Sequence, residues 1–167
     1  MTGTAFHIDI IPFSDELAPV FAALNKAWLV KYFAIEPLDI LMLDNPRKYF
    51  IDNGGHIFFA KINDNVAGTV ALLKMNEETY ELSKMAVAEN FQGLKVGNRL
   101  VELSIQKATQ LKAKKLILFS NTKLHPAIHL YRKYGFVEVP VGHTEYVRSD
   151  IKMELIIENY EQDRRAL

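Results

Sequence analysis

The chain contains no cysteine. Its 167 residues therefore cannot form a disulfide, a cysteine-ligated zinc site or an iron–sulfur cluster, and no cysteine can act as a nucleophile. Long apolar runs are absent as well. No stretch free of Asp, Glu, Lys and Arg exceeds nine residues, whereas a helix that crosses a bilayer needs about 20 apolar residues. The first residues also lack a basic start followed by an apolar run, so we expect no signal peptide and a cytoplasmic protein.

Net charge is also lacking. Twenty Lys and Arg residues balance twenty Asp and Glu residues, and this balance predicts that neither nucleic acid nor a membrane is a partner. The hydrophobic share of 49% and the charged share of 24% are those of ordinary soluble globular proteins. A chain of this length can bury a core of its own, so we expect one domain that spans residues 1–167.

The N-terminal third of the sequence predicts one strand and two helices. An apolar-rich segment over 6–13 contains a proline and is typical of an edge strand. Apolar residues at helical spacing predict a helix over 15–32, with Ser14 as its cap. A second helix should begin at Pro37 and be interrupted at Asn45-Pro46.

The remaining sequence predicts short strands and two more helices. The strands are expected at 56–62, 66–75, 80–87, 115–120, 136–139 and 150–157. The helices are expected at 94–111 and 125–134. Because a long helix separates the strand at 80–87 from the strand at 115–120, a crossover must join them, and we expect these two strands to be parallel.

A glycine-containing turn joins the strand that ends at Val87 to the long helix. The backbone N–H groups at a helix start are unpaired, and small residues let a ligand approach them, so such a turn suits a phosphate or pyrophosphate. The spacing fits neither a P-loop nor the dinucleotide fingerprint. The same residues could also form an ordinary glycine turn with a helix cap. They are Gln92, Gly93, Leu94, Lys95, Val96, Gly97 and Asn98.

Together with a second motif, this turn resembles the GNAT superfamily of N-acetyltransferases. Residues 92–97 are similar to the family's coenzyme A signature, Q/R-x-x-G-x-G/A, and residues 127–136 match its pattern A-x-x-L-Y-x-x-x-G-F. The resemblance covers nearly the whole chain. It implies an α/β (α+β) fold with a mixed, mostly antiparallel central sheet of six or seven strands flanked by about four helices. It also implies that the parallel pair, 80–87 and 115–120, is splayed.

One position departs from the family signature, because Lys95 stands where the family has its first motif glycine. If the backbone there is left-handed, a lysine is strained by about 1 kcal/mol or more. If the backbone is helical, the lysine is tolerated and its ammonium could pair with a phosphate. We expect the helical conformation, because Lys95 falls within the first turn of the predicted helix.

The resemblance implies direct transfer of an acetyl group from acetyl-CoA to a primary amine, with no metal. Tyr131 matches the family's tyrosine, which acts as the acid for the departing thiolate, although its ring could instead only pack on the core. The backbone N–H of Val87 would polarise the thioester carbonyl. Asn121 could reach the pantetheine arm or hold the next helix. Besides the turn at 92–98, the residues expected to contact coenzyme A are Met85, Ala86, Val87, Asn121 and Tyr131.

Glu81 is the candidate base. It stands six residues before Val87, where some family members have a catalytic glutamate that deprotonates the amine through a water. Strict alternation along the strand places Glu81 on the same face as Met85 and Val87. The alternative is a solvated glutamate at the end of a strand.

The acceptor and the partners are less defined by the sequence. The resemblance implies an amine of a small molecule, an amino acid or a peptide, and many relatives dimerise, which leaves a homodimer open. The acidic residues Glu36, Asp39 and Asp44 favour a cationic acceptor. His125 and His129 are four residues apart but lack a third ligand, so no metal site is expected. The alternative to an enzyme is a non-catalytic acyl-CoA-binding sensor or regulatory module.

Overall fold

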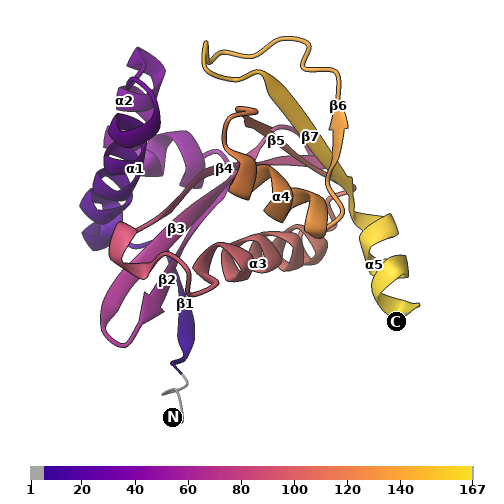
Figure 1. The fold of residues 1–167 in the computed structure, drawn as a ribbon, viewed down its shortest axis with the longest axis horizontal. Helices are drawn as coiled ribbons and strands as arrows, with labels where there is room; N and C mark the ends of the chain where they lie inside the picture. Colours follow the sequence, from indigo (N-terminus) through magenta and orange to yellow (C-terminus); the bar gives the residue numbers. More distant parts are fainter. Residues whose placement is uncertain (1–5, 167) are drawn as a thin grey trace.

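A computed structural model describes residues 6–166 and contains one seven-stranded sheet with helices on both faces (Figure 1). The strand order is β1-β2-β3-β4-β5-β7-β6, and every neighbouring pair is antiparallel except β4 and β5, which are parallel. This confirms the predicted fold class. The strands are β1 (Ile8–Pro12), β2 (His56–Ile62), β3 (Asn65–Lys74), β4 (Thr79–Val87), β5 (Lys115–Ser120), β6 (Val137–Val139) and β7 (Ile151–Ile156). The α-helices are α1 (Ala18–Tyr32), α2 (Pro37–Asp44), α3 (Val96–Gln110), α4 (His125–Lys133) and α5 (Ile157–Arg165).

The sheet has a hydrophobic core on each face, because successive side chains of a strand point to opposite sides. On β3, Val70 and Leu72 belong to the core beneath α3 and α4, whereas Ala71 belongs to the core beneath α1 and α2. In Figure 1, α1 and α2 lie together away from α3 and α4. Large aromatic side chains such as Phe21 and Phe50 fill the core beneath α1 and α2, and they pack edge to face with ring centroids 5.8 Å apart.

The parallel pair is joined only at its beginning. The last paired residues are Glu81 of β4 and Ile117 of β5. Beyond this point β5 continues to pair with β7 up to Ser120, while the rest of β4 is paired with β3 alone. The two strands therefore diverge toward their C-terminal ends, which opens a gap in the middle of the sheet.

A bulge in β4 reverses the side-chain alternation that we predicted. The pairing of β3 with β4 shifts register between Thr69 and Ala71, and Lys84 at this place has a left-handed backbone with φ of 53°. Because the bulge inserts one residue, Met85 and Val87 pack on the core beneath α3, as Leu82 does. The expectation that Glu81 shares a face with Met85 and Val87 is therefore wrong.

Two further expectations about helices are wrong. A helix, α5, follows β7, where the sequence was expected to close on a strand. The acidic Glu158 in its first turn and the basic Arg164 and Arg165 in its last turn suit the helix dipole, but Ile157 is its one buried residue, so it has little hydrophobic signal. Ser14 makes no side-chain capping bond, because a short 3-10 turn precedes α1.

Lys95 also differs from its predicted conformation. It is the N-cap of α3, with φ of 63° and ψ of 24°, and the helix begins at Val96. The backbone is therefore left-handed and not helical. The lysine adopts the conformation that the family glycine would allow without strain, at a cost of about 1–2 kcal/mol for a residue with a Cβ atom.

This strain gives a prediction for stability. Lys95→Gly should be more stable than Lys95→Ala by about 1 kcal/mol, because both variants lose the ammonium and only glycine removes the steric cost. The lower helix and chain rigidity of glycine makes the difference smaller than the full cost. Urea unfolding of the two variants measures it, and equal free energies of unfolding would contradict the prediction.

Candidate active site

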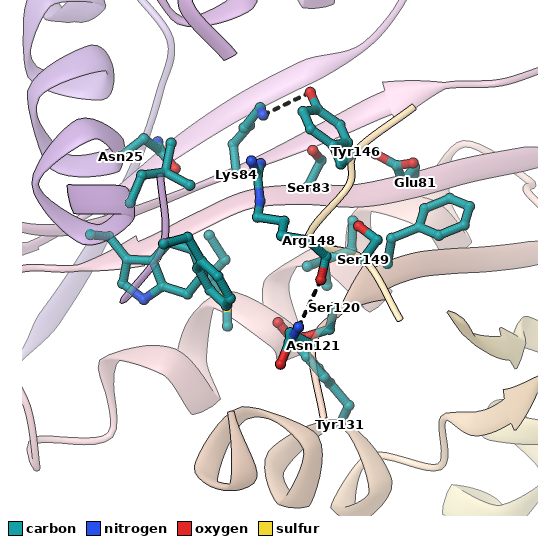
Figure 2. Close-up of a pocket in the computed structure, with 16 residues that line it drawn as sticks. Asn25, Glu81, Ser83, Lys84, Ser120, Asn121, Tyr131, Tyr146, Arg148 and Ser149 are labelled. Carbon is teal, nitrogen blue, oxygen red and sulfur yellow. Dashed lines mark hydrogen bonds between the residues drawn. The ribbon is translucent and has the colours of Figure 1, made fainter. Parts of the chain in front are cut away.

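The gap between β4 and β5 holds an inner cavity of about 110 Å³ (Figure 2). Its walls come from α1, β4, the end of β5, α4 and the loop that precedes β7. A wider outer groove of about 600 Å³ runs between the turn at 92–98 and α4. Trp28 and Met85 line both the cavity and the groove, so the two spaces adjoin at these side chains.

The glycine-containing turn forms one wall of the outer groove. Gln92, Gly93, Lys95, Val96, Gly97 and Asn98 line this groove. Gly93 has φ of +81°, and a Cβ atom there would meet nothing within 4 Å, so the backbone at this position faces open space. The unpaired N–H groups at the start of α3 lie at the same wall, where the helix dipole favours an anion. Leu94 differs from its neighbours, because it packs against the core beneath α3.

The end of β4 forms the next part of the groove. Met85 and Val87 line it, as expected of residues that contact coenzyme A. The side chain of Ala86, by contrast, is buried in the protein. Of the strand residues predicted to contact coenzyme A, Ala86 could therefore contribute only its backbone.

Tyr131 of α4 reaches the inner cavity from the side opposite the N-terminal helices (Figure 2). The residue is 7% exposed, and its ring packs on Phe136 with ring centroids 5.9 Å apart. Burial raises the pKa of Tyr131 to about 12. The neighbouring Tyr134 donates its hydroxyl to Glu102 at 2.7 Å and is thus engaged elsewhere. Of these two tyrosines on one helix, Tyr131 is the one that lines the cavity.

Glu81 lines the same cavity from β4, at the point where the strands diverge. Burial raises the pKa of its carboxyl group. A hydrogen bond to Ser83 and the charges of Lys84 and Lys152 act in the opposite direction, and Glu145 adds to the effect of burial. Glu81 is therefore not the freely solvated strand-end glutamate of the alternative interpretation.

A buried cluster of charges lies beside the cavity, and the sequence did not indicate it. Asp39 of α2 is 0% exposed and accepts two bonds of 2.7 Å from the Arg148 guanidinium. Lys84, at the bulge, donates to Asp39 at 2.9 Å and to the hydroxyl of Tyr146 at 2.9 Å (Figure 2). Glu36 completes the cluster through a salt bridge of 3.0 Å to Arg148.

The three acidic residues of the N-terminal region therefore do not form a free cation-binding site. Glu36 and Asp39 are paired with Arg148, and Asp44 is paired with Lys26 at 2.6 Å. The expectation that these carboxylates attract a cationic acceptor is wrong, because cations of the protein already neutralise them. Asp39 and Arg148 are 109 residues apart in the chain, so no local pattern could reveal the pairing.

The cluster has unequal effects on its members. Burial disfavours the charged form of Asp39, but the hydrogen bonds from Arg148 and Lys84 outweigh it and lower the pKa of this carboxyl group to about 2. Burial lowers the pKa of Lys84, although Asp39 opposes the change. The desolvation of Lys84 thus offsets part of the stability that the ion pair contributes.

Asn121 lies at the C-terminal end of β5 and lines the inner cavity. Its side-chain nitrogen donates to the carbonyl of Arg148 at 2.8 Å, and its side-chain oxygen accepts from the backbone N–H of Lys123 at 2.9 Å. Asn121 thus ties the loop before β7 to the turn that leads into α4. This matches the alternative in which it holds the next helix.

Two searches of residues 6–166 gave no result. They contain no group of three or more His, Asp or Glu side chains arranged to hold a metal ion. His129 instead lines the outer groove. Within the same described range, no helix is long and apolar enough to span a membrane.

Comparison with known sequences gives one family. A family model described as "Acetyltransferase (GNAT) family" matches residues 19–136. The chain is 33% identical over 117 residues to the uncharacterized N-acetyltransferase YvbK of Bacillus subtilis, which covers 68% of this chain and 75% of that protein. It is 26% identical over 143 residues to the spermidine N(1)-acetyltransferase of Escherichia coli K12, which covers 83% of this chain and 77% of the relative.

Solved structures share the fold. An acetyltransferase of the GNAT family from Staphylococcus aureus superposes with a TM-score of 0.81 at 20% identity, over 90% of this chain and 99% of that one. The spermidine N-acetyltransferase of Vibrio cholerae, in complex with CoA and spermine, superposes with a TM-score of 0.74 at 21% identity, over 92% of this chain and 98% of that one.

Proposed function

The chain belongs to the GNAT family of acetyltransferases, and from this premise we propose that it transfers the acetyl group of acetyl-CoA directly to the primary amine of a small molecule. One observation carries the proposal. The gap between β4 and β5 brings Glu81 and Tyr131 to one cavity, and this cavity adjoins the groove lined by the glycine-containing turn. A base, a proton donor and an anion-binding backbone thus surround one continuous space.

Acetyl-CoA fits the outer groove in charge and shape. The open backbone at Gly93 and the start of α3 suit the pyrophosphate, and Lys95 and Lys133 add positive charge to the same groove. The divergence of β4 from β5 leaves one edge of β4 without a partner strand, and the pantetheine arm can align along this edge as an added strand would. Met85 and Val87 would contact the arm there.

In the reaction, the amine nitrogen forms a bond to the acetyl carbon and the carbon–sulfur bond breaks. One proton leaves the nitrogen and one reaches the sulfur, so the products are an acetamide and free coenzyme A. Glu81 accepts the proton of the amine, directly or through a water. The backbone N–H of Val87 would donate to the carbonyl oxygen while that oxygen carries negative charge.

Tyr131 acts at the departing sulfur. With a pKa of about 12, it keeps its proton at neutral pH and is available as a donor. Complete transfer to a free thiolate would be uphill, because the pKa of a thiol is about 8.5. Tyr131 therefore donates a hydrogen bond that stabilises the sulfur while the bond breaks, and the proton lost by the nitrogen balances the thiol.

A thiol-release assay tests the proposal. Pure protein with acetyl-CoA is offered a panel of primary amines, and both free coenzyme A and the acetylated amine are measured. Amine-dependent thiol release with formation of the matching acetamide supports the function. Binding of coenzyme A without thiol release for any amine would instead indicate the sensor or regulatory module.

The role of Glu81 predicts a change in pH dependence. A base must be ionised, so kcat/KM of the parent should fall as pH drops through the raised pKa of Glu81. In Glu81→Gln this fall should vanish and the rate should drop by about 10²-fold or more. The amine's own titration should remain in both proteins.

Glu145→Gln provides the matched control. Glu145 is exposed, and its charge raises the pKa of Glu81. This variant should keep the fall and move it to slightly lower pH. If Glu81→Gln has the same pH profile as the parent, Glu81 is not the base.

A further inference from the structure

We infer that the acceptor is a small monoamine whose body, apart from the reacting amino group, is uncharged and apolar. This inference rests on the proposed function and narrows its substrate class. It comes from the charge balance and the size of the inner cavity between β4 and β5. Polyamines and free amino acids are excluded as preferred acceptors.

The charges around the cavity balance almost completely. Three charged side chains line it: Glu81, Lys84 and Arg148. The two cations are neutralised from behind by Asp39 and Glu36, at 2.7 to 3.0 Å. Among the described residues, the salt bridges involve both of these carboxylates but not Glu81. The cavity therefore presents one carboxylate that is free to meet an ammonium group.

A second ammonium group would have no partner in this cavity. It would enter beside Lys84 and Arg148, and the one available carboxylate, Glu81, would already be occupied by the reacting amine. A buried charge without a partner is strongly disfavoured. An acceptor with a second amino group should therefore bind in its productive position much more weakly than one without it.

A carboxylate on the acceptor fares no better. Arg148 already directs three N–H bonds to Asp39 and Glu36. A substrate carboxylate that competed for this guanidinium would weaken a bidentate pair and leave the charge of Asp39, which is fully buried, less compensated. The cluster thus holds the cations and does not offer them to a ligand.

The size and the apolar walls of the cavity match a compact body. Trp28, Leu29, Phe33 and Phe119 line it, and its volume is about 110 Å³. An apolar cavity of about 150 Å³ in another protein accommodates benzene. A short alkyl chain or one small ring fills such a space, and electrostatic complementarity then selects against charged bodies.

A series of four-carbon amines tests the inference, because only the far end differs while the reacting amine is the same. The series is butylamine, 4-aminobutan-1-ol, 1,4-diaminobutane and 4-aminobutanoate, with benzylamine and spermidine as further probes. After correction for its two amino groups, 1,4-diaminobutane should have a kcat/KM at least about fivefold below that of butylamine, and so should 4-aminobutanoate. A smaller difference, or the reverse order, would overturn the inference.

The series also separates the two proposals. If no amine supports thiol release, the proposed function itself fails. If 1,4-diaminobutane, spermidine or 4-aminobutanoate is acetylated as well as butylamine, the function stands and only the substrate class is wrong. Butylamine and benzylamine as the best acceptors would support both.

A variant makes the charge argument specific. Ser149 lines the cavity from the loop before β7. Ser149→Asp should raise the ratio of kcat/KM for 1,4-diaminobutane to that for butylamine by about fivefold, whereas the uncharged Ser149→Asn should leave it within about twofold. An unchanged ratio in a folded Ser149→Asp would overturn the assignment of the discrimination to this cavity's charge. Ser120→Asp, on the β5 side, repeats the test if Ser149→Asp does not fold.

Discussion

Tyr131→Phe should lower kcat by about 10²-fold or more, while coenzyme A binds to the variant as tightly as to the parent. The phenylalanine keeps the ring that packs on Phe136 and removes only the hydroxyl that reaches the inner cavity. The loss therefore falls on the step in which the carbon–sulfur bond breaks. Steady-state thiol release gives kcat, and calorimetric titration with coenzyme A gives the affinity.

Tyr134→Phe is the control on the same helix. It also removes one phenolic hydroxyl, which donates to Glu102 outside the cavity, so kcat should stay within about threefold of the parent. If Tyr131→Phe and the parent turn over at equal rates, Tyr131 is not the donor. A parallel loss of coenzyme A affinity would point to a binding role.

Asp39→Asn should lower the free energy of unfolding by about 3–5 kcal/mol, because it leaves the buried cations of Lys84 and Arg148 without their carboxylate. For a protein of this size that corresponds to a fall in Tm of roughly 6–20 °C. Asp44→Asn is the matched control on α2. Its salt bridge to Lys26 is half-exposed, and such pairs contribute at most about 1 kcal/mol.

The pH dependence of stability gives a second readout of Asp39. Its pKa is about 2 in the folded protein and about 3.9 in an unfolded chain. The stability that it contributes, roughly 2–3 kcal/mol before the offset from Lys84, is therefore present above pH 4 and lost as the pH falls from 4 to 2. Urea unfolding from pH 7 to 2 should show this loss in the parent and not in Asp39→Asn.

The double variant Asp39→Asn/Lys84→Met sharpens the assignment. It removes one of the two unpaired cations, so it should recover part of the stability that Asp39→Asn loses. If Asp39→Asn is no less stable than Asp44→Asn, the buried cluster does not hold α2 against the sheet.

The sequence predicted the elements whose signal is local. The alternation of apolar residues sets β2 and β5 at 56–62 and 115–120, as the structure has them. The two glycine-related motifs likewise identified the groove-lining turn and Tyr131. Both kinds of signal depend on residues close together in the chain, so one sequence contains them in full.

The features that it missed depend on partners far away. The bulge at Lys84 arises from a register shift against β3, and a lysine is not a residue that marks a left-handed backbone. The cluster of Asp39, Lys84 and Arg148 joins three distant segments, so each residue by itself looked like an ordinary surface charge. Lys95 was predicted helical because the hydrophobic period of α3 continues past it, while the backbone turns there.

The long separation of Asp39 and Arg148 also bears on the order in which the protein assembles. A chain is synthesised from its N-terminus, so α1 and α2 exist long before Arg148 does. Asp39 cannot be buried at low cost until its cations are present. The two helices made first are therefore expected to settle on the sheet late, after the loop before β7 has formed. The cavity for the acceptor would then be among the last parts of the molecule to close.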